Sequence, residues 1–381
     1  GVLNATSVSG GTGTATINFN HINTNYHFTD NGTATGNAIV ISGSTSVNFI
    51  GSGTTTLTGN HTYTGNTTVN NGTLRLADNN RISDAGNMVI NGGTFDLNNF
   101  NETVANLYGT GGVINLGNSG NSTLTVNQTV NSTYGGSFIG NANSFSHNPL
   151  IKNGPGTLTL GGTSLQTGSA QITVNAGRLA VAGGNAIADT YGLTGAGEFE
   201  LLNDETISNL SMGSTGKVLL NDNTLTIRTV PAMVGNNNAA ISGTGSIVIS
   251  GDGGQNMHAA SNYTGTTTLN SGQLNTFNPY ALGNNSAVTV NTNAALSLGD
   301  HLRIGSLAGN GTVNLAGTPG PNTLTSGANN ASTIFSGVIS GADGRLTKTG
   351  TGTLTLTGTN TYTGATTVDA GALVVTGSIA N

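Results

Sequence analysis

Residues 350–375 read GTGTLTLTGTNTYTGATTVDAGALVV, and this stretch decides the fold because the chain carries it more than once. Residues 51–76 read GSGTTTLTGNHTYTGNTTVNNGTLRL, identical at 16 of 26 positions across an offset of 299 residues. Fainter copies lie at 153–181 and 261–274. Equivalent glycines open the four blocks: Gly51, Gly154, Gly251 and Gly350. Their spacings of 103, 97 and 99 residues indicate a chain built from repeated units.

A shorter rhythm runs inside each block. Leu354 and Leu356 alternate with threonines, and apolar runs of this kind return about every 20 residues between Gly and Asn turns. Sandwich domains use longer strands and close within about 100 residues, whereas a solenoid accepts short strands over its whole length. We therefore predict an all-β fold, a right-handed parallel β-helix (solenoid) of roughly 18 three-stranded coils. Residues 1–381 are expected to form a single rod-like fragment of such a helix.

Stacked coils explain the unusual composition. One coil cannot bury its apolar face alone, but its neighbours can, so a sequence that stacks well can be repeated. Inward Leu, Val and Ile then form a narrow core, while outward Thr, Ser and Asn face water. Glycine suits corners that need a positive φ, and stacked Asn side chains can bond along the ladder.

The charge and the residue content argue against a nucleic-acid partner, a membrane-spanning helix and disulfide bonds. Only 6% of the 381 residues are charged, the net charge is −6, and nine Lys and Arg residues are scattered along the chain. A nucleic-acid reader would need clustered basic residues, so we expect no nucleic-acid partner. No apolar run approaches the 18 residues of a membrane-spanning helix, and the absence of Cys excludes disulfides.

The stretch at 352–375 closely resembles the passenger-associated β-strand repeat of bacterial autotransporters, which reads G-x-L-x-L-x-G-x-N-x-Y-x-G-x-T-x-V-x-x-G-x-L. Residues 51–76 carry the same string, 153–181 lack the Tyr, and 261–274 keep the second half. The resemblance implies a passenger exported by a C-terminal β-barrel translocator and displayed at the bacterial cell surface or outer membrane, or released. Since neither a signal peptide nor that barrel is recognisable, we expect a processed passenger fragment.

Enzymatic chemistry has little support in the sequence. A serine protease needs a nucleophile, a base and an orienting group in contact, and no Gly-rich turn here carries the serine. A polysaccharide lyase on a β-helix would need grouped carboxylates, and one acidic cluster exists: Glu198, Glu200, Asp204 and Glu205. This cluster is a candidate Ca²⁺ site, with a solvated acidic face as the favoured alternative. We expect no catalytic residues and no cofactor, and we expect that the protein is not an enzyme.

Two groups of aromatic residues are candidate ligand or adhesion sites. The segment FNHINTNYHF contains the first group: Phe19, His21, Tyr26, His27 and Phe28. A cap over the first coils is the favoured reading for it, ahead of a binding patch or a metal-binding His pair. The second group stands at equivalent positions of the repeats: Tyr63, Tyr263 and Tyr362. These residues either pack into corners or form an exposed aromatic ladder.

The resemblance and the polar surface together predict adhesion. The faces of the coils would attach to host proteins or glycans, or to sister passengers, through many weak hydrogen bonds. A secreted toxin or a passenger that signals through a host receptor is the alternative, and a polysaccharide-degrading enzyme ranks behind both.

Overall fold

The computed structural model describes residues 3–118, 122–143, 147–231, 233–317 and 320–380. Within these ranges the chain is all-β and forms no helix. Its turns number about 16, close to the predicted 18. The chain divides into two compact units, unit 1 (Gly1–Gly192) and unit 2 (Leu193–Asn381), and each is a parallel β-solenoid. A helix able to span a membrane is not found in any part of the chain that the structure describes.

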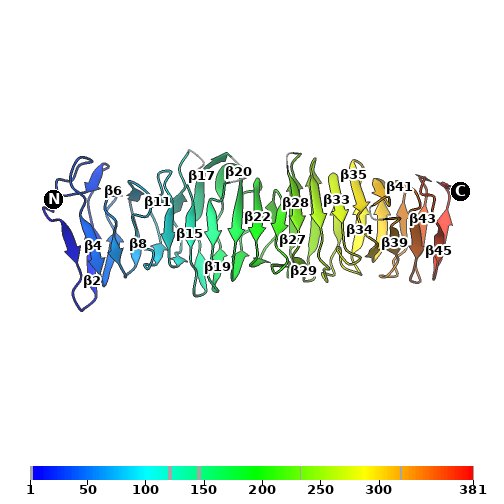
Figure 1. Ribbon diagram of the computed structural model, residues 1–381, viewed down its shortest axis with the longest axis horizontal. Helices are drawn as coiled ribbons and strands as arrows, with labels where there is room; N and C mark the ends of the chain where they lie inside the picture. The colour runs from blue at the N-terminus through cyan, green and yellow to red at the C-terminus, as the bar shows by residue number, and fades with distance from the viewer. Residues whose placement is uncertain (1–2, 119–121, 144–146, 232, 318–319, 381) are drawn as a thin grey trace. The chain divides into compact units, whose positions relative to one another are not determined.

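Unit 1 consists of short strands that follow one another from blue to green in Figure 1. They are β1 (Ser7–Ser9), β2 (Ala15–Phe19), β3 (Tyr26–Phe28), β4 (Val40–Gly43), β5 (Thr45–Phe49), β6 (Thr54–Leu57), β7 (Thr62–Tyr63), β8 (Thr67–Val69), β9 (Thr73–Leu76), β10 (Met88–Ile90), β11 (Thr94–Asp96), β12 (Glu102–Val104), β13 (Leu107–Tyr108), β14 (Val113–Asn115), β15 (Leu124–Val126), β16 (Ser132–Tyr134), β17 (Ser137–Asn143), β18 (Leu150–Lys152), β19 (Thr157–Leu160), β20 (Leu165–Val174) and β21 (Arg178–Val181).

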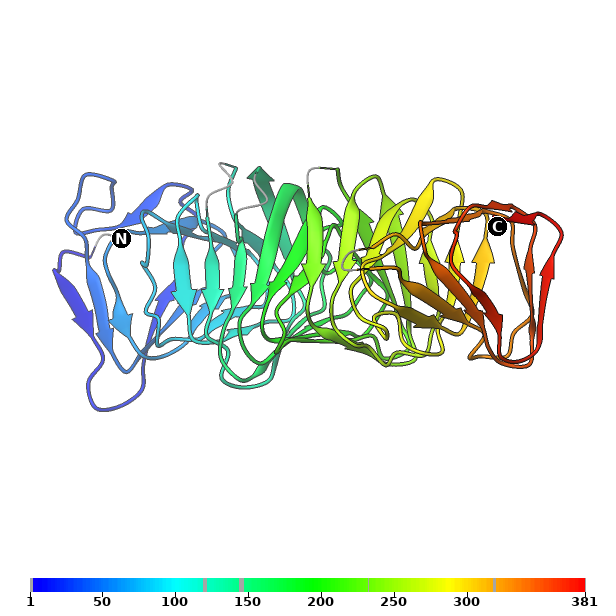
Figure 2. The ribbon, with the colours of Figure 1, turned by 45° about the vertical axis from the view of Figure 1, so that its right-hand side comes forward.

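Unit 2 repeats the pattern from green to red, and Figure 2 shows its chain winding from strand to strand around an interior. The boundary between the units falls within β22 (Tyr191–Gly195). The strands after it are β23 (Glu198–Leu201), β24 (Glu205–Ile207), β25 (Leu210–Met212), β26 (Lys217–Leu219), β27 (Thr224–Thr229), β28 (Val234–Asn237), β29 (Ala240–Ser242), β30 (Ser246–Gly251), β31 (Gly254–Met257), β32 (Thr267–Leu269), β33 (Gly272–Thr276), β34 (Ala287–Val290), β35 (Ala294–Leu298), β36 (Leu302–Ile304), β37 (Ser306–Gly309), β38 (Thr312–Asn314), β39 (Thr323–Ser326), β40 (Thr333–Phe335), β41 (Val338–Ser340), β42 (Arg345–Lys348), β43 (Thr353–Leu356), β44 (Thr359–Asn360), β45 (Thr366–Val368), β46 (Ala372–Val375) and β47 (Ser378–Ile379).

The core consists of columns of apolar side chains, because strands one turn apart pair in parallel and in register. In unit 1, β9, β11, β14 and β17 align four buried residues: Leu74, Phe95, Ile114 and Phe138. In unit 2, β33, β35, β38 and β41 align another four: Leu274, Leu296, Val313 and Ile339. Burying each such side chain contributes about 1.5–3 kcal/mol, which no single coil could obtain alone.

Asparagine side chains form ladders along the outside, as the composition predicted. In each ladder the Nδ2 of one Asn donates to the Oδ1 of the Asn one turn earlier, so the amides bond along the stacking direction. The rows are Asn127–Asn153–Asn175 in unit 1, at 3.0 and 2.9 Å, and Asn236–Asn256–Asn275 in unit 2, at 2.8 and 2.7 Å. The ladders hold successive coils in register without using any charge.

One glycine of the repeat is required by its backbone conformation. It lies at the start of the last strand of each copy and has φ values of 61°, 61°, 76° and 70° at Gly72, Gly177, Gly272 and Gly371. A Cβ at Gly72 would also collide with the backbone carbonyl oxygens of Gly51 and Gly53. This corner therefore accepts only glycine without strain.

Candidate functional site

The repeat tyrosines lie in the core. Tyr63, Tyr263 and Tyr362 are 0%, 1% and 0% exposed, so the exposed aromatic ladder considered from the sequence does not form. Each hydroxyl bonds the Oγ1 of the threonine four residues later: Thr67, Thr267 (2.5 Å) and Thr366 (2.7 Å). Burial raises the pKa of all three tyrosines. The rings are corner-packing elements whose polar ends are satisfied inside the repeat itself.

The first aromatic segment divides between core and surface. Phe19 and Phe28 are buried; their rings meet edge to face at 5.0 Å, and Phe19 also stacks on Phe49 at 5.0 Å. His21 and Tyr26 are half-buried, with ring centroids 4.9 Å apart, and line a cavity of about 330 Å³ together with both phenylalanines.

The histidines of this segment are only partly sheltered. His21 Nε2 lies 2.8 Å from the Oγ1 of Thr55, and burial lowers the pKa of His21. His27 is half-buried on β3, and its Nδ1 is buried and has no hydrogen-bond partner among the described residues. The segment therefore supplies both a packed aromatic end to the core, as the cap reading predicts, and a small half-open cavity.

The acidic cluster is distributed over separate contacts. Alternation on β23 turns Glu198 and Glu200 outward, with Phe199 and Leu201 buried, as predicted. Glu198 Oε1 accepts from Lys217 Nζ at 2.7 Å, and Lys217 is its register partner one turn later.

The remaining two acids of the cluster have structural contacts. Asp204 Oδ1 accepts from the backbone N–H of Thr224 at 2.7 Å, and Glu205 is only 2% exposed. Glu205 therefore does not belong to a solvated acidic face. Across the described ranges, no three His, Asp or Glu side chains come close enough to hold a metal ion, so the four acids do not assemble a Ca²⁺ site there.

Glu205 has a counterpart in Glu102, a residue that was not among the candidates predicted from the sequence. Both begin equivalent stretches, ETISNL and ETVANL, and both are buried. Glu102 accepts from the backbone N–H groups of Arg81 (2.9 Å), Ile82 (3.1 Å) and Thr103 (3.0 Å), so it clamps two successive coils. Burial raises the pKa of Glu102 to about 7, against the opposing effect of these N–H donors.

Two lysines are also buried. Their burial was not expected from the sequence, in which the few charged residues were assigned to the surface. Lys152 and Lys348 are 0% and 1% exposed and stand at the same place in two repeats, before Gly154 and Gly350. Each ammonium donates to three backbone carbonyls: Asn153, Gly154 and Ala176 for Lys152, and Thr349, Gly350 and Ala370 for Lys348. Burial lowers the pKa of Lys152 to about 8 and also lowers that of Lys348. These lysines connect backbone segments one turn apart and are not available to a ligand.

An open polar surface lies in unit 2, on the sheet of β36, β39, β42 and β45. Register places Arg303, Thr325, Thr347 and Thr367 in one row across the four strands. A second row pairs Thr323 with Arg345. Between the rows, Leu324 and Leu346 point into the core and are fully buried. We call the outward surface the threonine–arginine groove, made of Arg303, Thr323, Thr325, Arg345, Thr347 and Thr367.

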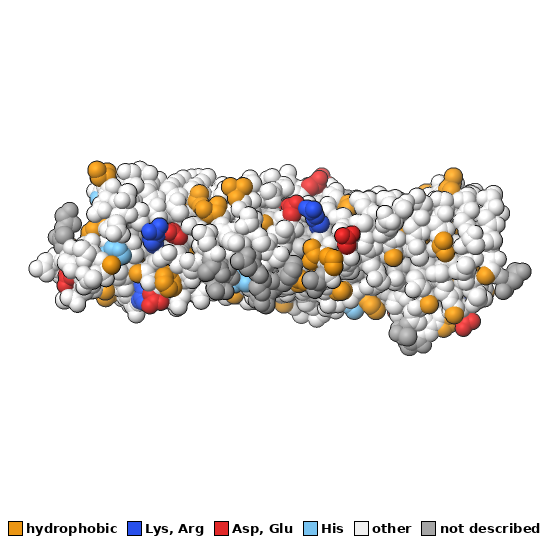
Figure 3. Space-filling model, turned by 90° about the horizontal axis from the view of Figure 1, so that it is seen from above, with side chains coloured by type: hydrophobic (Ala, Val, Ile, Leu, Met, Phe, Trp, Pro, Cys, Tyr) orange, Lys and Arg blue, Asp and Glu red, His pale blue; other side chains and the backbone are white. Residues whose placement is uncertain are grey.

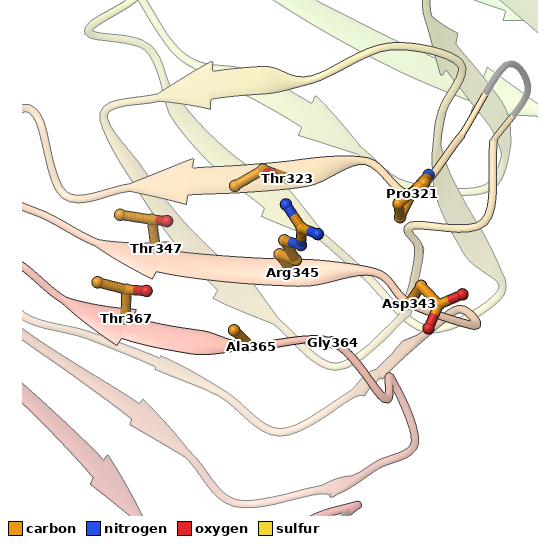
Figure 4. A pocket seen from close by; sticks show the side chains of 8 residues that line it. All are labelled: Pro321, Thr323, Asp343, Arg345, Thr347, Gly364, Ala365 and Thr367. Carbon is orange, nitrogen blue, oxygen red and sulfur yellow. The ribbon is translucent and has the colours of Figure 1, made fainter.

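Two adjoining cavities make up the groove. One of about 660 Å³ is lined by Thr323, Arg345, Thr347 and Thr367, with Pro321, Asp343, Gly364 and Ala365 at its margins. Figure 4 shows Arg345 on the middle strand, between the strand of Thr323 and the strand of Thr367. The other, of about 290 Å³, shares Thr323 and Thr347 and adds His301, Arg303, Thr325, Thr349 and Asp369. The shared threonines make the two cavities continuous along the sheet.

The two guanidinium groups of the groove differ from several other basic groups of the chain in forming no ion pair with a described acidic residue. Arg75, Arg81 and Lys217 form ion pairs with acidic side chains at 2.7, 2.9 and 2.7 Å. Arg303 and Arg345 are exposed, and neither forms an ion pair with any described acidic residue. They are therefore free to bind an anionic group of a ligand. Figure 3 shows one face of the molecule, on which charged side chains are few and scattered.

His301 has a fixed orientation beside Arg303. Its Nδ1 accepts from the backbone N–H of Thr323 at 3.0 Å, so the proton of the neutral ring lies on Nε2. The groove thus offers two cations, one imidazole N–H and several threonine hydroxyls. None of these residues stood out in the sequence, because the spacing between register partners changes from 22 to 20 residues along the row.

The comparisons with known proteins agree with the resemblance seen in the repeats. The passenger-associated-transport-repeat family matches residues 50–76, 150–181 and 346–375, which are three of the four copies identified from the sequence. A stretch of 91 residues, 24% of the chain, is 37% identical to the adhesin BmaC autotransporter of Brucella suis biovar 1 and spans 3% of that protein. No solved structure is significantly similar to the chain. Three stretches of the chain therefore carry passenger-associated transport repeats, and about a quarter of the chain is similar to part of an autotransporter adhesin.

Proposed function

We propose that the chain mediates adhesion, attaching to host surfaces or to sister passengers through the outer faces of its coils. The observation that carries the proposal is the regular polar exterior, in which Asn ladders and Thr rows present hydrogen-bonding groups turn after turn. Each such bond is worth about 0.5–1.5 kcal/mol net, so a single contact is weak. Many copies displayed on one cell surface would bind tightly through multivalency.

The similarity to an autotransporter adhesin supports this role over an enzymatic one. Passengers of this class are displayed at the cell surface or secreted, and a C-terminal translocator in the full-length protein would export this one. We propose a non-enzymatic role, because within the described residues no three His, Asp or Glu side chains form a metal-binding group, and Glu198 and Asp204 are held in structural contacts.

The experiment that tests adhesion uses latex beads coated with the purified chain. We expect these beads to attach to epithelial cell layers or to aggregate with one another, and soluble chain to inhibit either effect. Beads coated with an unrelated β-solenoid protein are the control for nonspecific sticking. Absence of both attachment and aggregation, combined with a strong response of the cells to soluble chain, would contradict adhesion and favour a signalling passenger.

A further inference from the structure

The threonine–arginine groove has the chemistry of a saccharide-binding surface. We propose that it binds an oligosaccharide that carries carboxylate groups, such as a uronate or a sialate. The proposal deepens the adhesive function proposed above and rests on it, because it names the ligand class of one face.

The charges of the groove suit a carboxylated ligand. Arg303 and Arg345 form no ion pair with any acidic residue in the described part of the chain, and planar guanidinium groups bind carboxylates through two parallel hydrogen bonds. Asp343 lines one cavity and Asp369 the other, so the two carboxylates balance the two positive charges. A polyanion such as nucleic acid or a densely sulfated glycan would need an excess of positive charge. The balanced groove favours a ligand with isolated carboxylates among neutral groups.

The hydroxyls of the groove suit sugar hydroxyls. Thr325, Thr347 and Thr367 stand on successive strands, about 4.8 Å apart, and Thr323 is two residues from Thr325, or about 6.6 Å along the strand. Each hydroxyl is both a donor and an acceptor, like the hydroxyls of a sugar, and the threonine methyl groups can contact the C–H face of a ring. The carboxylates of Asp343 and Asp369 can accept from further sugar hydroxyls.

The shape of the groove favours an extended ligand. The two cavities are continuous through Thr323 and Thr347, with Arg345 on the first and Arg303 on the second. From strand spacing and register, the Cα atoms of the two arginines are about 12 Å apart, a span for a chain of sugar rings. A peptide is a weaker fit, because among the described residues that line the cavities only Pro321 and Ala365 have apolar side chains. A single-stranded nucleic acid would stack its bases on aromatic rings, and His301 is the only ring in this lining that could serve.

The test measures binding of the whole chain to three carboxylated polysaccharides: polygalacturonate, hyaluronate and polysialate. Matched probes are methyl-esterified polygalacturonate, in which the carboxylates are neutralised, neutral dextran, dextran sulfate and poly-L-glutamate. We expect binding to at least one carboxylated polysaccharide. Arg345→Gln or Arg303→Gln should weaken this binding about ten- to a hundredfold, because each variant loses a charge-assisted hydrogen bond to the carboxylate. Arg228→Gln, an exposed arginine of unit 2 outside the groove, is the matched control and should bind like the parent. Circular dichroism should show the same β-structure in all variants.

Several outcomes would overturn the proposal. These are no binding to any of the three carboxylated polysaccharides, equal binding to the methyl ester, stronger binding to dextran sulfate or poly-L-glutamate, or equal affinity of the groove variants and the Arg228→Gln control. The bead assay separates this failure from that of adhesion. If Arg303→Gln and Arg345→Gln beads still attach as the parent does, adhesion stands and the saccharide groove fails. If beads never attach but polysaccharide binding depends on both arginines, the groove stands and the adhesive role fails.

Discussion

The copies of the repeat at 51–76 and 350–375 lie in different units, and the comparison between them separates what stacking requires from what it leaves free. Both copies bury the tyrosine, bond its hydroxyl to the threonine four residues later and turn at a glycine with positive φ. They differ where side chains point outward, as at Arg75, whose place is taken by Val374. The tyrosine corner and the turn glycine are therefore repeated, and outer positions can change independently. Inward positions after the corner differ in burial, since Val69 and Leu76 are buried whereas their counterparts Val368 and Val375 are 48% and 41% exposed.

At one inward position the copies have different residues that make the same kind of hydrogen bond. In three copies of the repeat, the residue two positions before the tyrosine has a side chain that accepts a hydrogen bond. The donor is the backbone N–H of an isoleucine one turn earlier. The pairs are Ile41 with His61 Nδ1 at 3.0 Å, Ile241 with Ser261 Oγ at 3.2 Å, and Ile339 with Asn360 Oδ1 at 3.0 Å. The constraint is on hydrogen-bonding capacity rather than on residue type, because a buried N–H without a partner costs about 1–3 kcal/mol.

Removing the repeat tyrosine should give the largest effect and should affect both copies equally. Tyr63→Ala and Tyr362→Ala each empty a fully buried site, so we expect each to lower the local free energy of unfolding by about 3–5 kcal/mol. Hydrogen–deuterium exchange of peptides covering each copy measures this locally. Tyr280→Ala, at a side chain 44% exposed, is the control and should cost little. A loss in one copy below about 1 kcal/mol would show that the corners are not equivalent.

Acid should distinguish the copies, because only the first uses a histidine as the acceptor. Burial lowers the pKa of His61 to about 4, from an ordinary value near 6.5. The unfolded chain then binds the proton more readily than the folded one. The stability contributed by neutral His61 is complete above pH 6.5 and is lost as the pH falls toward 4, by up to about 3 kcal/mol. His61→Asn copies the acceptor of the last repeat and should abolish this dependence.

The acid prediction is checked by comparing hydrogen exchange, or the thermal midpoint, of the parent and His61→Asn at pH 4.5 and pH 7.5. The peptide around Asn360 serves as the internal control, since its acceptor does not titrate in this range. If the parent and the variant lose the same stability on acidification, His61 is not the group responsible.

Removing only the tyrosine hydroxyl should give a smaller and again equal effect. Tyr63→Phe and Tyr362→Phe keep the ring in its corner and delete one buried hydrogen bond to a threonine. We expect each to cost about 1 kcal/mol, measured by urea unfolding followed by circular dichroism or by local exchange. A cost matching that of the alanine variants would mean that the hydroxyl, rather than the packing of the ring, holds the corner.

The smallest effect is expected where the copies differ on the outside. Arg75 pairs with Asp96 at 2.7 Å; the arginine side chain is 42% exposed and that of Asp96 is 7% exposed, so solvent and salt screen the pair from the side of the arginine. Arg75→Val gives the first copy an aliphatic residue at this position, as in the last, and should cost about 1 kcal/mol or less, with a smaller cost in high salt. A loss of several kcal/mol would contradict the view that outward positions vary freely.

The fold could be predicted because its determinants are local and repeated. Alternation at Leu354 and Leu356, the turn glycine of each copy and the Asn-rich corners each have one simple structural meaning, and the structure confirms them. Alternation also placed Glu198 and Glu200 on the outer face. The repeat string further identified passenger-associated repeats, and the family match confirms three of the four copies.

The surface was harder to predict, because it depends on the register between coils of unequal length. Arg303, Thr325 and Thr347 are 22 residues apart, whereas Thr347 and Thr367 are 20 apart, so a fixed period does not align the groove. The inward tyrosines and Lys152 carry polar groups usually found at surfaces, and only the hydrogen-bond partners inside the repeat explain their burial.

The in-register parallel stacking has a practical consequence for anyone who wishes to modify this protein. Because neighbouring strands lie about 4.8 Å apart, the same outward substitution in successive turns would place identical chemical groups in a straight line at that interval. The row from Thr325 to Thr367 already provides three such positions, two of them beside the fully buried Leu324 and Leu346. Cysteines introduced there would be the only thiols of the chain, so labels or catalysts could be mounted at molecular-scale spacings with no competing reactive sulfur.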